Sequence, residues 1–132
     1  MDKKYLSKII ATDNEGLQMI SACCSGAEIK VGNIKYLAKS KVFLMSLKRS
    51  KVEMEGENKK VISICKFEFV DRVKSKNIKQ IDPEKELELI GIDYLKNNDN
   101  YEISLIFTNN VYIMLSTEII EVTLDDQISI TK

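Results

Sequence analysis

Hydrophobic and polar residues alternate with a period of two along most of the chain, which is the pattern of half-buried strands. The period becomes helical only near the N-terminus, where apolar residues recur on one side at Leu17, Ile20 and Cys24. Thr12 stands three residues before Glu15, which is the spacing of a capping box, and the Ser25-Gly26 pair is suited to end a helix. We therefore expect one helix at about residues 13–24.

Strands are predicted over most of the remaining chain. The alternating stretches are 5–11 before the helix and 28–31, 34–36, 42–47, 61–73, 87–95, 101–107, 111–115 and 119–124 after it. Asn109-Asn110 separates two alternating runs and is the strongest hairpin signal in the chain. Residues 53–60 and 74–86 are polar or charged and are predicted as loops, and a tail with a short final turn or strand begins at Asp125.

The stretch 61–73 is longer than the other predicted strands and is apolar on both faces. One face holds Val61, Cys65, Phe67 and Phe69, and the other holds Ile62, Ile64 and Val70. Such a run is typical of a central strand, or of a strand that bends between two sheets.

These elements predict an α+β protein that forms one domain over residues 1–132. We expect a curved, mainly antiparallel sheet or split barrel of about seven or eight strands, with the N-terminal helix packed against it. A barrel with a pleckstrin-homology-like outline is a variant, although that class carries its helix at the C-terminus.

The chemical composition removes several classes of function. The chain has no histidine, which excludes Ser-His-Asp hydrolases, Cys-His nucleophiles and histidine-ligated metals. Its three cysteines are an odd number and are expected to be small core residues. No glycine-rich phosphate loop is present. We expect a protein that is not an enzyme and that holds neither a metal nor another cofactor.

The length of the apolar runs bears on the compartment. The first ten residues remain charged through Lys8, and no run reaches the length of a signal peptide core or a membrane span. We expect a cytoplasmic protein with no membrane contact. Lysine, isoleucine and asparagine are abundant, whereas arginine occurs only twice, which is typical of a bacterium with an AT-rich genome.

Several stretches resemble a small uncharacterised family of alphaproteobacterial proteins, catalogued as a domain of unknown function. The resembling stretches are Asp13–Ala22, Val31–Leu37, Phe43–Arg49, Phe67–Ile78 and Ile119–Val122. The resemblance implies a small, bacterial, cytoplasmic protein and carries no activity with it. Relatives have an aromatic and acidic sequence after the arginine that corresponds to Arg49, whereas this chain has Ser50-Lys51-Val52 there.

A net charge of zero conceals an uneven distribution of charge. Residues 1–85 carry 18 Lys and Arg against 11 Asp and Glu, whereas residues 86–132 carry 2 against 9. Between residues 30 and 51 there are seven basic residues and no acidic one: Lys30, Lys35, Lys39, Lys41, Lys48, Arg49 and Lys51. We predict that these seven residues are the candidate partner-binding residues.

Three interpretations of the basic segment remain. Lysines on a sheet edge deter pairing with another sheet edge, so the segment can be a solvated edge without a ligand. It can instead contact an acidic protein, including a second copy of this chain in a homodimer. Binding of nucleic acid or a phosphate-bearing ligand is the third, disfavoured because Tyr36 and Phe43 are expected in the core and cannot stack on bases. The leading hypothesis is a binding or adaptor module that contacts another protein.

Overall fold

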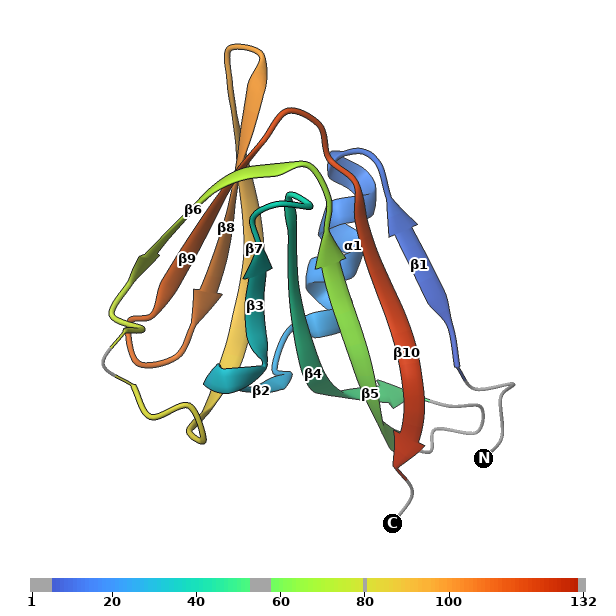
Figure 1. Cartoon of the computed structure of the whole chain (residues 1–132). Helices are drawn as coiled ribbons and strands as arrows, with labels where there is room; N and C mark the ends of the chain where they lie inside the picture. Colours follow the sequence, from blue (N-terminus) through green and yellow to red (C-terminus); the bar gives the residue numbers. More distant parts are fainter. Residues whose placement is uncertain (1–5, 53–57, 80, 131–132) are drawn as a thin grey trace.

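The computed structural model describes residues 6–52, 58–79 and 81–130 of the chain. The described part contains one α-helix, one short 3-10 helix and ten strands (Figure 1). In chain order these are β1 (Lys8–Ala11), α1 (Asn14–Cys24), β2 (Glu28–Lys30), η2 (Val31–Asn33), β3 (Ile34–Leu37), β4 (Val42–Val52), β5 (Asn58–Phe67), β6 (Val70–Lys76), β7 (Glu86–Asn97), β8 (Asn100–Phe107), β9 (Tyr112–Thr117) and β10 (Val122–Ile130).

All ten strands belong to one antiparallel sheet. The order across the sheet is β1-β10-β5-β4-β2-β7-β8-β9-β6, and β3 pairs with β4 next to β2. The sheet bends strongly but does not close into a barrel, so β6 and β9 lie opposite β3 and β4 (Figure 1). The predicted α+β fold with a curved antiparallel sheet and one N-terminal helix is confirmed, with ten strands in place of seven or eight.

The helix begins one residue later than predicted and is capped by a different residue. The side chain of Asp13, not that of Thr12, accepts a hydrogen bond from the backbone N–H of Gly16 at 2.8 Å. An aspartate at this position satisfies one of the free N–H groups of the first turn. Gly26 has a φ of +85°, which only glycine adopts without strain, and this residue ends the helical segment as expected.

The long apolar stretch 61–73 is a strand that bends between the two halves of the sheet. β5 ends at Phe67 and β6 begins at Val70, and Phe69 between them has a φ of +59°. The corner reverses the alternation, because Phe69 is exposed whereas Val70 is buried. Phe69 was expected on the same face as Val61 and Cys65, and this expectation is wrong.

Two segments predicted as loop or tail are strands. β6 continues to Lys76 because Val73–Lys76 pair with β9, and β10 continues to Ile130 because its second half pairs with β5. These residues are too polar to signal a strand by themselves, and the neighbouring strands supply the hydrogen bonds that hold them extended. Of the loop predicted at 53–60, the last three residues belong to β5, and 53–57 lie outside the described residues.

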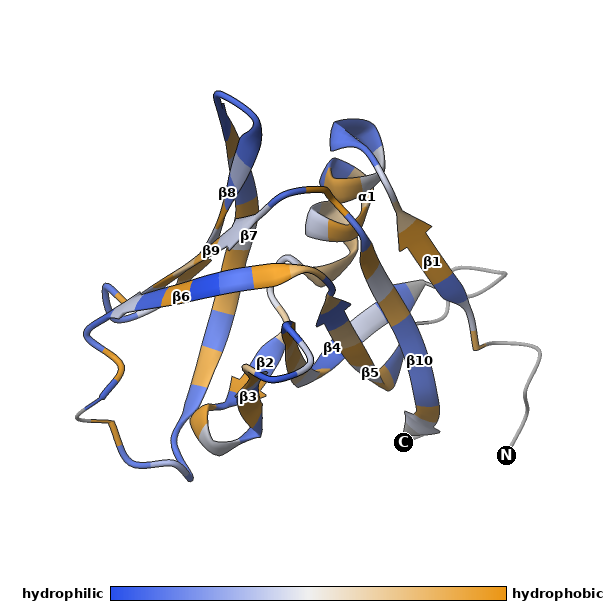
Figure 2. Ribbon diagram, turned by 45° about the horizontal axis from the view of Figure 1, so that its top comes forward, coloured by the Kyte–Doolittle hydropathy of each residue, from blue (hydrophilic) through white to orange (hydrophobic). Residues whose placement is uncertain are grey.

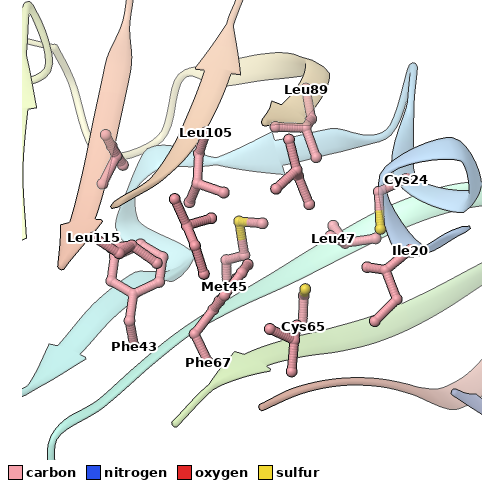
Figure 3. Packing of buried hydrophobic residues seen from close by; sticks show 14 of the residues in the cluster. Ile20, Cys24, Phe43, Met45, Leu47, Cys65, Phe67, Leu89, Leu105 and Leu115 are labelled. Carbon is pink, nitrogen blue, oxygen red and sulfur yellow. The ribbon is translucent and has the colours of Figure 1, made fainter. Parts of the chain in front are cut away.

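The concave side of the sheet holds the core. Hydrophobic and hydrophilic positions alternate along β6 and β7 in Figure 2, so each strand turns one row of side chains inward. Helix α1 adds Leu17, Ile20 and Cys24, and Figure 3 shows Ile20 and Cys24 next to Leu47 and Cys65. The helix contacts β7, β1 and β4, and it therefore fills one side of the concave surface while side chains such as Phe43 fill the other.

Candidate functional site

Two edges of the sheet meet at an open groove. Among the residues that the structure describes, β6 is the last strand of the sheet and pairs only with β9, and β3 pairs only with β4. The two halves approach each other at one end, where the Tyr36 hydroxyl donates a hydrogen bond to the carbonyl of Val70 at 2.8 Å and the N–H of Val70 donates to the carbonyl of Lys41 at 2.8 Å. Beyond this contact the edges are separate.

We call the space between these edges the β3–β6 groove. It has a volume of about 370 Å³ and is mostly apolar. Its walls come from β3, β6, β9 and the segment after β6, and they include Ile34, Tyr36, Val73, Ile78, Ile81 and Ile113. A volume of this size lies in the range of ligand-binding pockets, about 300–1,000 Å³.

The segment between β6 and β7 closes the far end of the groove. Gly32 donates its N–H to the carbonyl of Pro83 at 2.8 Å, and Val31 donates to the carbonyl of Lys85 at 3.0 Å. A Cβ atom on Gly32 would lie 3.2 Å from the carbonyl oxygen of Pro83, so a larger residue would push this segment away. These contacts hold Ile78 and Ile81 half-buried against the groove.

The two faces of β6 differ in chemistry. Val73 and Ser75 face the groove, whereas Arg72 and Lys74 line a polar hollow on the opposite face of the strand. Lys76 is exposed and continues the parity of the basic residues. The strand therefore turns Val73 and Ser75 toward the groove and a basic row toward solvent.

The seven predicted partner-binding residues do not form one basic face. Lys30 lies 3.5 Å from Glu84, Lys41 lies 3.0 Å from Asp71, and Lys48 lies 3.9 Å from Glu28. Each of these ion pairs is exposed or half-exposed. Lys35 on β3 and Lys39 in the following turn are exposed and have no acidic partner among the described residues.

The remaining two basic residues, Arg49 and Lys51, enter a buried ion cluster with Asp126. Arg49 and Asp126 are 5% and 0% exposed at their side chains, with 2.9 Å between Nη2 and Oδ1. Nζ of Lys51 lies 3.1 Å from Oδ2 of Asp126. The Ser63 hydroxyl and the N–H and hydroxyl of Ser7 also donate to this carboxylate, at 2.7–3.0 Å.

These contacts set the charge state of Asp126. Burial alone would raise the pKa of its carboxyl group, but the hydrogen bonds from Ser63, Arg49, Lys51 and the backbone of Ser7 outweigh burial and lower it well below the usual value. The carboxylate is therefore ionised at neutral pH, and its two oxygens are fully used. The cluster attaches the residue before β1 to β4, β5 and β10, and Arg49 and Lys51 share this one carboxylate.

Comparison with known proteins identifies the family. The chain matches the family described as protein of unknown function DUF2948 over residues 7–131. It belongs to this family. No curated protein and no solved structure matches the chain. The family's description gives no activity, so any functional argument depends on the residues themselves.

The DUF2948 chain has apolar groove residues that the sequence alone did not single out. Residues 74–86 were expected to be a charged loop, yet Ile78 and Ile81 in this segment wall the groove. These two isoleucines within a charged stretch were the available signal. Val73 was expected within a strand, but its position on an unpaired edge follows only from the strand order.

Other candidate chemistry in the DUF2948 chain is sparse. Residues 6–52, 58–79 and 81–130 contain no group of three or more Cys, Asp or Glu that could hold a metal ion. Cys24 and Cys65 are buried in the core and Cys23 is half-buried, and none of them forms a disulfide. Within the described ranges no helix is long and apolar enough to cross a membrane.

Proposed function

We propose that the protein is a non-enzymatic binding module that contacts another protein through the β3–β6 groove. One observation carries this proposal: a mostly apolar groove of about 370 Å³ lies between β3 and β6, each of which pairs with a described strand on one side only. Unpaired edges next to apolar side chains are templates for association with another chain. Because the groove is open along its length, a protein segment can enter it from solvent.

The basic residues support the same surface in part. Three lysines near the groove have no acidic partner among the described residues. Lys35 lies on β3, Lys39 lies in the turn after β3, and Lys79 lies on the groove wall. An acidic partner would be attracted to this side of the molecule. Nucleic-acid binding through residues 30–51 is less supported, since five of the seven basic residues there already contact carboxylates.

We also propose that the protein acts in the cytoplasm of an alphaproteobacterium. Its resemblance to alphaproteobacterial proteins supports this setting. A second copy of the chain is the alternative occupant of the groove.

A photo-crosslinking experiment tests the proposal. A benzophenone amino acid replaces Lys79 on the groove wall or, as the control, Gln18 on the exposed side of α1. In cells of the source organism we expect a discrete protein adduct from position 79 and none from position 18. The adduct is identified by peptide mass spectrometry, and the purified partner is then tested for direct binding.

Two tryptophan variants decide whether the groove itself is used. Ser75→Trp fills the groove from an exposed position, whereas Leu95→Trp places the same bulk on an exposed position of β7. We expect the first variant to lose binding of the purified partner and the second to retain it. Equal adducts from positions 79 and 18, an adduct between two copies, or full binding by Ser75→Trp would each overturn the proposal.

A further inference from the structure

The backbone of β6 is available to a further strand. Six of its seven residues pair with β9 on one side, and Asp71 lies at a bulge between Val70 and Arg72. Apart from the pairing with β9, no backbone hydrogen bond from Asp71–Lys76 to a described residue is present. Alternate N–H and C=O groups along the free side therefore point away from the sheet. An extended peptide alongside β6 would satisfy these groups by continuing the ladder.

The side chains of such a peptide would meet two different environments. Successive residues of a strand point to opposite faces of a sheet. One row would lie in the β3–β6 groove, against Ile34, Tyr36 and Val73. The other row would lie on the outer face beside Arg72, Lys74 and Lys76, three basic residues on a single strand. The two faces of β6 would thus favour a peptide in which two kinds of side chain alternate.

The charge on the outer face favours one sign in the peptide. Arg72, Lys74 and Lys76 form no ion pair with a described acidic residue, although Asp99 and Glu102 line the same polar hollow. The one acidic residue of β6, Asp71, is paired with Lys41 at 3.0 Å. Opposite charges in directly adjacent strand positions attract, and like charges repel. A second copy of β6 would bring three basic residues against three basic residues, which disfavours self-pairing.

We infer that the β3–β6 groove binds an extended protein segment of alternating apolar and acidic residues, which adds as a strand to the free edge of β6. The apolar side chains enter the groove and the carboxylates meet Arg72, Lys74 and Lys76. This inference rests on the proposed binding function and names the chemistry of the partner segment. The three basic residues then have two effects at the free edge of β6: they repel another basic strand and they favour an acidic one.

Synthetic peptides test the inference on the whole purified chain. The probe is a peptide of about nine residues with alternating valine and glutamate, compared with a block isomer in which all valines precede all glutamates. We expect fluorescence anisotropy to show the alternating peptide binding at least about tenfold more tightly, and less tightly as salt increases. Amide NMR shifts should be confined to Val70–Lys76 and Ile34–Leu37. Equal binding of the two isomers would overturn the inference.

N-methylated peptides distinguish strand addition from contact by side chains alone. One peptide is methylated on the valine nitrogens and the other on the glutamate nitrogens. A strand added to one edge uses the N–H groups of only one of the two sets. We expect one methylated peptide to lose binding and the other to retain it. Binding by both peptides would rule out a backbone ladder.

A reversal of charge provides the matched variant. In the double variant Lys74→Glu and Lys76→Glu, the valine–glutamate peptide should bind at least about tenfold more weakly, and a valine–lysine peptide should gain binding. Both residues are exposed, so the variant is expected to fold. Unchanged preference between the two peptides would overturn the charge argument. If the crosslink at position 79 still depends on the groove while no alternating peptide binds, the inference fails and the proposed function stands.

Discussion

Arg49 and Asp126 lie 77 residues apart in the chain, yet their side chains form a buried ion pair of 2.9 Å inside the sheet. Ser63 lies directly opposite Asp126 across β5 and β10, and it links the two charged groups by accepting from Nε of Arg49 and donating to Asp126. A charge without water around it is costly unless it has such partners. The pair therefore fixes how β4, β5 and β10 align.

Substitution of the carboxylate should destabilise the protein strongly. Asp126→Asn keeps the shape of the side chain but leaves Arg49 as a buried charge without its counterion. We expect a loss of about 3–5 kcal/mol in the free energy of unfolding. Urea denaturation followed by circular dichroism measures this change. The matched variant Glu84→Gln breaks only the exposed pair with Lys30 and should cost less than about 1 kcal/mol. Similar losses for both variants would contradict the role of burial.

The same carboxylate should control stability in acid. Because the pKa of Asp126 is lower in the folded chain than in the unfolded chain, its contribution is fully present above the unfolded pKa. The contribution is lost as the pH falls below about 4 and toward the folded pKa. We expect the stability of the parent protein to fall more steeply between about pH 4 and about pH 2 than that of Asp126→Asn. Parallel curves for the two proteins would show that Asp126 is not the group responsible.

The three cysteines should differ in reactivity although two are adjacent in the chain. Cys65 is fully buried, and its hydrogen bond with Cys24 and its burial both raise the pKa of its thiol. The thiolate is the reactive form, so Cys65 should resist modification in the native state. The hydrogen bond with Cys65 lowers the pKa of the Cys24 thiol, but Cys24 is fully buried, so a reagent in solvent should not reach it either. Treatment with a maleimide should label only half-buried Cys23, whereas all three react in denaturant, as counted by mass spectrometry. In Cys23→Ser the native protein should remain unlabelled, and rapid labelling of Cys65 would contradict the packing.

The hydrogen bond between Tyr36 of β3 and Val70 of β6 should limit how far the groove opens. Tyr36→Phe removes only the hydroxyl that donates to the carbonyl of Val70 at 2.8 Å. The loss of this hydrogen bond should cost about 1 kcal/mol in the free energy of unfolding. It should also speed amide hydrogen exchange in β6. Tyr112→Phe is the control, since the side chain of Tyr112 is more than a third exposed and no hydrogen bond of its hydroxyl is formed with described residues. Equal rates of amide hydrogen exchange in both variants would show that this hydrogen bond does not hold β3 and β6 together.

The local elements were predictable because each depends on residues close in sequence. The helix followed from apolar residues at helical spacing, and its true cap, Asp13, stands next to the residue expected to cap it. The Asn109-Asn110 turn followed from residues that tolerate a positive φ, and both have one, of 64° and 58°. The alternation of strands also identified the core, since Met45, Cys65 and Leu105 are fully buried.

The groove and the buried ion cluster were decided only by the tertiary structure. Alternation indicates which face of a strand is buried, but it does not indicate which strand lies beside it, so the sequence could not show that β6 and β3 are unpaired edges. Arg49 has the parity of buried Leu47 within β4, but its charge made a solvent-exposed position the natural expectation. Asp126, brought opposite Ser63 by strand pairing, supplies the counterion that makes its burial possible. The sequence by itself determined the elements and their inward faces, because these depend on short-range patterns. Tertiary contacts determined which strands are edges, where the groove lies and which basic residues form ion pairs, because these depend on pairings between distant segments.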